Sequence, residues 1–75
     1  MILEKAKREA IDMLLRLPYD DVEPELNIQR CEHGIWFGMG WLIGRGWVKY
    51  SGNYHVSFAR HGREHAARYI NDIRS

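Results

Sequence analysis

The chain has 75 residues, a net charge of +1 and 45% hydrophobic side chains, so it is long enough for one domain and too apolar to be intrinsically disordered. Its single cysteine, Cys31, excludes an intrachain disulfide and is typical of a reducing compartment. Mixed charges at the N-terminus and a longest charge-free stretch of residues 34–44 predict neither a signal peptide nor a membrane span. We therefore expect one cytoplasmic domain over residues 1–75.

Two helices are predicted in the first half of the chain. Apolar side chains recur at three- and four-residue steps over residues 2–17, and Pro18 prevents the helix from continuing. Residues 19–25 are acidic, and a carboxylate at Asp20 or Asp21 suits a helix N-cap. Pro24 is tolerated in a first turn. These features predict a short second helix over residues 22–31.

Residues 34–44 are apolar almost all round, so their periodicity does not define a buried face. Their position between a short helix and a hairpin predicts a third helix. Its internal glycines oppose this, because each costs about 1 kcal/mol relative to alanine. Glycines four residues apart would let another backbone approach the helix closely, and that close packing is the expected compensation.

A β-hairpin follows in residues 47–58, where apolar and polar side chains alternate on both sides of residues 51–53. We expect a three-residue loop, since it pairs Val48 with Val56 and Tyr50 with Tyr54 on one face. Lys49 would lie on the opposite face. An apolar stripe then predicts a last helix over residues 60–73.

Charge is distributed unevenly along the chain. Residues 1–44 carry −3, from five basic and eight acidic side chains, whereas residues 45–75 carry +4, from six basic and two acidic ones. The C-terminal half is therefore suited to face a phosphate backbone, although a mixed solvated surface would have the same composition.

The order helix, short helix, helix, two-stranded hairpin, helix resembles the winged helix-turn-helix family. The tail carries the likeness, from Trp41 through the segment Gly44-Arg45-Gly46-Trp47-Val48 and the hairpin to the segment of residues 58–66. Phe58 stands where the family has a leucine after the wing, and Gly62 where it has a glycine. The resemblance covers about 35 residues. It implies an α+β winged-helix domain with three helices, a two-stranded wing and a C-terminal helix.

The resemblance also implies a function. In such regulators the third helix enters the major groove of double-stranded DNA, and the wing contacts phosphates or the minor groove. The chain would then be a DNA-binding, non-catalytic regulator, and a dimer is expected. Carried over to this sequence, the nucleic-acid-binding residues are Arg45, Lys49, Asn53, His55, Arg60 and Arg63.

An alternative function follows from the third helix, which offers no side chain suited to reading base edges apart from tryptophan N–H groups. Aromatic side chains and methionine are enriched in the cores of protein interfaces. The segment of residues 35–43 would then bind a second subunit or another protein, with Trp36, Phe37 and Met39 at the interface. Trp41 is expected inside the domain.

Two patterns hint at chemistry without predicting an enzyme. Residues 61–65 match H-x-x-E-H, an inverted zinc-protease motif, but fall at a wing-to-helix junction in a very small domain. A zinc site formed by His61, His65 and the pair Cys31 and His33 lacks a standard spacing. Cys31 is best read as a structural cysteine. We therefore expect no catalytic residue, no metal and no cofactor.

Overall fold

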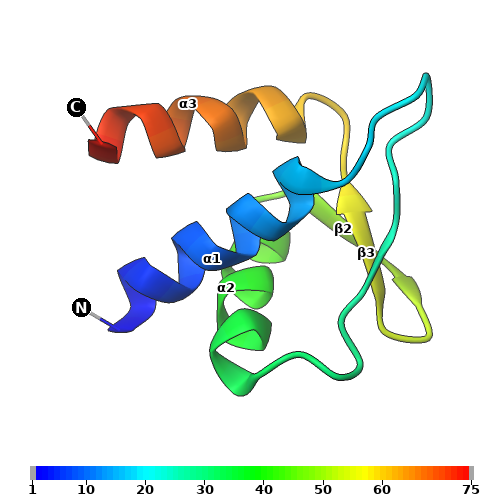
Figure 1. Ribbon diagram of the computed structural model, residues 1–75, viewed down its shortest axis with the longest axis horizontal. Coiled ribbons are helices and arrows are strands. Elements are labelled where there is room, and N and C mark those ends of the chain that lie inside the picture. The colour runs from blue at the N-terminus through cyan, green and yellow to red at the C-terminus, as the bar shows by residue number, and fades with distance from the viewer. Residues whose placement is uncertain (1, 75) are drawn as a thin grey trace.

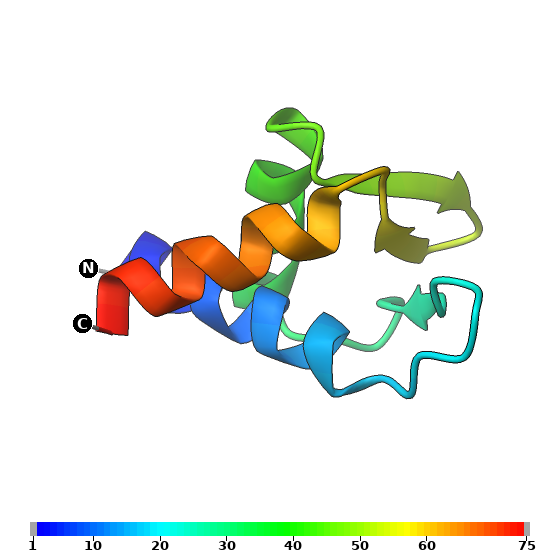
Figure 2. The same ribbon diagram turned by 90° about the horizontal axis from the view of Figure 1, so that it is seen from above.

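Three helices and a three-stranded antiparallel sheet form an α+β domain over residues 2–74, the part of the chain that the structure, a computed structural model, describes. The element order is α1 (Ile2–Arg16), β1 (Leu26–Asn27), α2 (His33–Gly44), β2 (Val48–Gly52), β3 (His55–Phe58) and α3 (Gly62–Arg74). Helices α1 and α3 run in opposite directions, so the start of α1 and the end of α3 lie at the same end of the molecule (Figures 1 and 2).

The predicted first, third and last helices are confirmed. Helix α1 ends at Arg16, two residues before Pro18, as the helix-breaking geometry of proline requires. Its buried side is small and aliphatic, with Ala6, Ala10, Ile11 and Leu14 at most 5% exposed. This side packs mainly against α2. None of the helices within residues 2–74 is long and apolar enough to cross a membrane.

Helix α2 has one glycine that the fold itself explains. A Cβ atom at Gly38 would overlap with the backbone carbonyl of Ala6 and would lie 2.9 Å from the Cβ of Ala10. Only a glycine lets α1 and α2 approach this closely. The expected compensation for a helical glycine is therefore present at Gly38. A Cβ at Gly34, Gly40 or Gly44 would meet nothing within 4 Å, so no contact among residues 2–74 requires glycine at these three positions.

The predicted second helix over residues 22–31 is wrong. This segment is extended and contains β1, in which Leu26 pairs with Val56 and Asn27 with His55. Exposure alternates along it, since Leu26 is half-buried, Asn27 exposed and Ile28 buried. That two-residue period belongs to a strand.

The segment is extended because it pairs with β3, a strand that lies far from it in the sequence. Without β1, the outer edge of β3 would present unpaired backbone groups. Pairing with β1 covers that edge, and the Ile28 N–H extends the contact by donating a 2.8 Å hydrogen bond to the Tyr54 carbonyl. The acidic residues that suggested a helix N-cap instead lie in the loop before β1.

The hairpin is present, but its predicted register is wrong. Strands β2 and β3 are neighbours in a sheet of order β1-β3-β2, and Val48 pairs with Phe58 rather than Val56. Tyr50 pairs with Val56 rather than with Tyr54. The buried face still contains Val48 and Val56, so the alternation of sides was correct while the pairing was not.

The turn explains the shifted register. Asn53 and Tyr54 form a two-residue turn in which both have positive φ, 50° and 63°, the conformation that matches the twist of a hairpin. The ladder shifts between Tyr50 and Gly52, so Ser51 is an extra residue in β2. A two-residue turn combined with this bulge keeps the apolar side chains of the two strands on one face.

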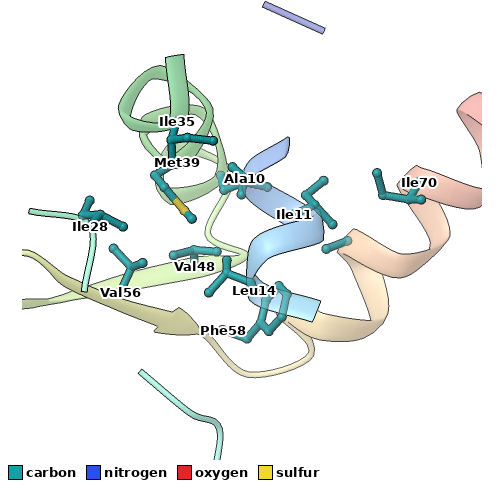
Figure 3. Close-up of a cluster of buried hydrophobic side chains, with 12 residues drawn as sticks. Ala10, Ile11, Leu14, Ile28, Ile35, Met39, Val48, Val56, Phe58 and Ile70 are labelled. Carbon is teal, nitrogen blue, oxygen red and sulfur yellow. The ribbon is translucent and has the colours of Figure 1, made fainter. Parts of the chain in front are cut away.

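The core lies where α1, α2, α3 and the inner face of the sheet meet (Figure 3). Met39 of α2 and Leu14 of α1 both point toward the strands that carry Val48 and Val56 (Figure 3). The cluster consists of Ala10, Ile11, Leu14, Ile28, Ile35, Met39, Leu42, Val48, Val56, Phe58, Ala66 and Ile70. Every helix and the strands β2 and β3 contribute buried side chains to this cluster, and Leu26 of β1 packs against it.

Candidate functional site

Helix α2 has a buried side and an exposed side, although its sequence is apolar on both. Ile35, Gly38, Met39 and Leu42 are buried. The opposite side, which we name the outer face of α2, is exposed at every position. It consists of His33, Phe37, Gly40 and Gly44. Their spacing of four, three and four residues places them on one stripe of the helix.

The most prominent side chain of the outer face is Phe37, which is 70% exposed. Neither of the two glycines on this face adds a side chain to cover it. An exposed phenylalanine next to Gly40 contributes nothing to the core, and Gly40, inside the helix, weakens α2 by about 1 kcal/mol relative to alanine. The outer face therefore departs from what the stability of this helix alone would favour.

Aromatic side chains of the hairpin continue this surface along one side of α2. Trp36, Ile43, Tyr50 and Tyr54 are between 37% and 51% exposed, and we name them the tyrosine flank. Together with Gly40 they line a shallow groove of about 260 Å³, floored by Ile28 and Met39. The groove is smaller than most small-molecule pockets, which range from about 300 to 1,000 Å³. Its size suits an inserted side chain.

Trp36 is held in place within the flank. Its indole Nε1–H donates a 2.6 Å hydrogen bond to the carbonyl of Ile28, and its ring stacks on Tyr54 with centroids 6.1 Å apart. The backbone N–H of Tyr54 donates to the hydroxyl of Tyr50 at 2.9 Å. These contacts join the segment before α2 to the hairpin, so the side chains of the tyrosine flank are held in place by the chain itself.

The outer face and the tyrosine flank form one apolar surface without a charged side chain of their own. From the exposed fractions, and with 150–250 Å² for a whole aromatic side chain, its large apolar side chains leave roughly 500 Å² open to solvent. Patches of this size are near the upper end of those found on monomeric proteins and often mark binding sites.

Two of the three side chains expected at a protein interface lie on this surface. Trp36 is 40% exposed and Phe37 is 70% exposed. Met39 is not there, because it is 1% exposed and belongs to the core. It sits on the opposite side of α2 from Phe37 and Gly40. A helix that is apolar all round gives no sequence signal for which side is buried.

The residues predicted to bind nucleic acid do not gather into one basic surface. Lys49 lies on the face of the hairpin that the acidic loop covers, in a groove lined also by Asp21, Glu23 and Glu25. Ser51, two residues after Lys49 in β2, donates a 2.8 Å hydrogen bond to Glu25. Carboxylates beside the hairpin weaken its attraction for phosphate.

Arg63 is part of an ion pair instead of an exposed patch. Its guanidinium contacts both carboxylate oxygens of Glu23, at 2.9–3.2 Å, with about a quarter of each side chain exposed. The same guanidinium lies over the rings of Tyr19 and Phe58. This arrangement fastens the acidic loop to the start of α3, so Arg63 has a structural partner within the chain.

Asn53 and His55 occupy the hairpin turn. His55 Nδ1 lies 2.8 Å from the Asn53 carbonyl oxygen, which only accepts a hydrogen bond, so this nitrogen carries the proton. Asn53 adopts the left-handed conformation that the turn needs. Arg60 is exposed in the loop between β3 and α3. These residues lie at the surface, separated from Arg45 at the C-terminal end of α2.

Arg45 belongs to a second cluster, formed where α1, α2 and α3 meet. Its guanidinium lies over Trp41 and Trp47, whose rings are in edge contact 5.5 Å apart, and the ammonium of Lys7 lies 4.2 Å above Trp41. Both tryptophans are half-buried, so Trp41 is less enclosed than expected. Lys7, for which no role was predicted, is 9% exposed.

A hydrogen-bonded acid completes this cluster. Glu4 accepts hydrogen bonds from the hydroxyl of Tyr69 at 2.9 Å and from Lys7 at 3.2 Å, and these two contacts lower the pKa of its carboxyl group. Burial, followed by the bond to Glu4, raises the pKa of the Tyr69 phenol. The hydrogen-bonded residues are up to 65 positions apart in the sequence, so no local sequence pattern predicts these contacts.

The suggested zinc and cysteine chemistry has no assembled site in the described chain. Among residues 2–74, no three His, Cys, Asp or Glu side chains come together to hold a metal. His65 stacks on Trp47 with centroids 5.8 Å apart, and His61 lies 3.8 Å from Glu64. Burial raises the pKa of the Cys31 thiol, which disfavours the reactive thiolate.

The fold and the exposed surface describe this domain without assigning it to a family. It is an α+β domain of three helices and a three-stranded antiparallel sheet, with an exposed aromatic surface on α2. No family model matches the chain, and neither a curated protein nor a solved structure is significantly similar to it.

Proposed function

We propose that this protein is a non-catalytic protein-binding module that docks its partner on the outer face of α2 and the tyrosine flank. The observation that carries the proposal is the exposure of Phe37, at 70%, on a helix whose opposite side is held by the core. A buried aromatic side chain at the centre of an interface often supplies much of the binding energy.

The fixed arrangement of the tyrosine flank supports the same proposal. Trp36 is fixed by its bond to Ile28 and by stacking on Tyr54, so it loses little conformational freedom when a partner covers it. The shallow groove beside Gly40 offers room for an apolar side chain of the partner. Apolar anchors with a groove between them are the usual features of a helix- or loop-binding surface.

Site-specific photocrosslinking tests this proposal. A photoreactive phenylalanine analogue replaces Phe37 in the full chain, and a matched chain carries it at Arg68, an exposed residue of α3. Irradiation in an extract of the source cells is expected to give protein adducts from position 37 and few from position 68. Equal yields from both positions would contradict the proposal. Mass spectrometry of the adducts shows whether the partner is this chain or another protein.

Nucleic-acid binding by a winged-helix domain is a second candidate, favoured by the exposure of Arg45, Lys49 and Arg60 in the half of the chain that carries +4. In this proposal the hairpin is the wing, and binding is mainly electrostatic. The acidic loop beside Lys49 and the Glu23–Arg63 pair reduce the available positive charge.

Fluorescence anisotropy with random duplex DNA at low salt tests the second candidate. Binding at micromolar protein that weakens as salt rises, and that is lost on Lys49→Glu, is the expected result. Absence of binding at these concentrations would exclude the wing as a DNA-binding element. The variant Phe37→Gln is the matched control, since it leaves the basic residues unchanged.

A further inference from the structure

An open groove of about 560 Å³ lies between the acidic loop of residues 19–25 and the hairpin. Its volume falls within the range of small-molecule sites, about 300 to 1,000 Å³. It shares no lining residue with the groove of the tyrosine flank, so it is a separate site. The residues that line it are Tyr19, Asp21, Val22, Glu23, Glu25, Lys49, Ser57 and Phe58.

Ser57 is the least exposed polar residue of this groove. It lies in β3, the central strand of the sheet, and pairs with Lys49 of β2. Successive side chains of a strand point to opposite faces of the sheet. Ser57 therefore points away from the core side, where Val56 is buried, and toward the groove that it lines together with Lys49. Only 2% of the residue is exposed.

The hydroxyl of Ser57 has no hydrogen-bond partner within residues 2–74. No fully enclosed polar side-chain atom of the described chain lacks a partner, so the Ser57 oxygen keeps contact with the groove. A hydroxyl that is nearly buried without a partner lowers stability, and such groups are uncommon in native structures. A ligand that forms a hydrogen bond with this hydroxyl from within the groove would account for it.

The charged side chains of the groove divide into engaged and free ones. Glu23 is held by an ion pair with α3, and Glu25 accepts a hydrogen bond from β2. Asp21 and Lys49 are exposed, and their side chains have no ion pair or hydrogen bond within the described part of the chain. The groups left for a ligand are therefore one carboxylate, one ammonium and the hydroxyl of Ser57.

These three groups define the charge of the ligand. A single metal ion does not fit, because no three acidic, histidine or cysteine side chains among residues 2–74 come together to hold one. A simple amine would leave Lys49 without a partner, and a simple anion would leave Asp21 without one. A ligand with both an ammonium and a carboxylate group pairs with both side chains.

The groove also offers apolar contact. Tyr19 and Val22 of the acidic loop are 55% and 74% exposed, and both line the groove. Small-molecule sites combine such apolar walls with a few polar groups that fix the orientation of the ligand. The ligand therefore has a hydrocarbon part in addition to its two charges.

We propose that this groove binds a small zwitterion of the amino-acid class. Its carboxylate accepts hydrogen bonds from the Ser57 hydroxyl and the Lys49 ammonium, its ammonium donates to Asp21, and its hydrocarbon part packs against Tyr19 and Val22. The inference goes beyond the proposed function, because it concerns a second site on the other side of the domain's sheet. Either one stands if the other fails.

Titration of the full chain, followed by nuclear magnetic resonance, tests the proposal. The probes are L-leucine and L-phenylalanine, with adjacent charges, and 6-aminohexanoate, with separated charges. At least one is expected to give saturable shifts at the amides of Ser57 and Lys49. The amide and the N-acetyl derivative of that probe, which lack one charge each, are expected to bind at least about tenfold more weakly. Absence of saturable shifts with all three amino acids at millimolar concentrations would overturn the proposal.

Three variants locate the bound zwitterion. Ser57→Ala, Lys49→Gln and Asp21→Asn are each expected to raise its dissociation constant about fivefold or more. Asparagine is chosen because residue 21 has a φ of 66°, a left-handed conformation that asparagine tolerates. Arg68→Gln, an exposed position on α3, is the matched control and should leave the dissociation constant unchanged. Equal effects of all four substitutions would place the binding elsewhere and overturn the assignment.

Thermal unfolding distinguishes a ligand-binding hydroxyl from one that serves the fold. Without ligand, Ser57→Ala is expected to leave Tm unchanged or to raise it, because the variant no longer buries an unpartnered hydroxyl. The zwitterion should raise the Tm of the wild type more than that of the variant. A lower Tm together with an unchanged dissociation constant would show that the hydroxyl is satisfied by water within the fold, and would overturn its role in binding.

Discussion

Gly38 of α2 lies directly against the backbone carbonyl of Ala6 in α1, at a distance that leaves no room for a Cβ atom. The contact sets the separation of the two helices and thereby decides which side of α2 is buried. Gly40, two residues further along the chain, faces solvent with nothing within 4 Å of the place where its Cβ would be. The two glycines therefore have opposite consequences when replaced.

Gly38→Ala is expected to destabilise the domain by at least about 2 kcal/mol, because the methyl group forces α1 and α2 apart. Gly40→Ala is expected to stabilise the domain by up to about 1 kcal/mol, because alanine favours the helix. Urea unfolding of the two variants and the wild type measures both effects. Similar effects of the two substitutions would show that α1 and α2 do not meet at Gly38.

The ion pair between Glu23 and Arg63 is expected to contribute to stability despite its position near the surface. It is bidentate and only about a quarter exposed, so it is screened less than an open surface pair. A double-mutant cycle with Glu23→Gln and Arg63→Met should give a coupling energy of about 1 kcal/mol. The coupling should decrease only slightly in high salt. A value near zero would mean that the acidic loop is not fastened to α3.

Acidification is expected to lower the free energy of unfolding, in part through protonation of Glu4. The hydrogen bond from Tyr69, and then that from Lys7, lower the pKa of this carboxyl group below its ordinary value of 4.5. A lowered pKa in the folded state gives stability that is present above the pKa of the unfolded chain and is lost as pH falls through the folded value. The loss should therefore occur on acidification below about pH 4.5.

Tyr69→Phe tests this link, because it removes the largest cause of the shift. Denaturant unfolding of wild type and variant between pH 3 and pH 7 should show a smaller fall in unfolding free energy for the variant. Titration of the Glu4 carboxyl by nuclear magnetic resonance should show its pKa returning toward the ordinary value. An unchanged pH dependence in the variant would contradict the assigned role of the Tyr69 hydroxyl.

Trp36→Phe is expected to loosen the segment that precedes α2. The substitution keeps an aromatic ring near Tyr54 but removes the N–H that binds the Ile28 carbonyl. The loss should cost about 1 kcal/mol. Hydrogen exchange should quicken at the Ile28 amide, which donates to the Tyr54 carbonyl at the edge of the sheet. Exchange at the Leu14 amide, within α1, provides the comparison and should be less affected.

Much of the secondary structure follows from patterns local in the sequence. The stripe of Ala6, Ala10 and Leu14 and the following Pro18 define α1. Alternation in the hairpin correctly places Val48 and Val56 on the buried side. Such patterns succeed because the periods of helices and strands are properties of the backbone alone.

Other features depend on residues that meet only after folding. The segment around Leu26 is a strand because it pairs with the open edge of β3. The helix-capping propensity of Asp20 or Asp21 is a local property and does not predict that pairing. The register of the hairpin depends on a bulge at Ser51. The partners of Arg63 and Glu4 lie 40 and 65 residues away. The pairing of Arg63 with Glu23 removes one cation from the basic surface that the local charge pattern suggested.

The sequence by itself predicted that residues 34–44 form an apolar, glycine-containing helix. Only the tertiary structure decided that Met39 turns to the core while Phe37 and Gly40 face outward. A helix with apolar residues on all sides can bury either side at similar hydrophobic gain. The choice depends on the fit of Gly38 against Ala6, a contact between two backbones that no periodicity of side chains encodes.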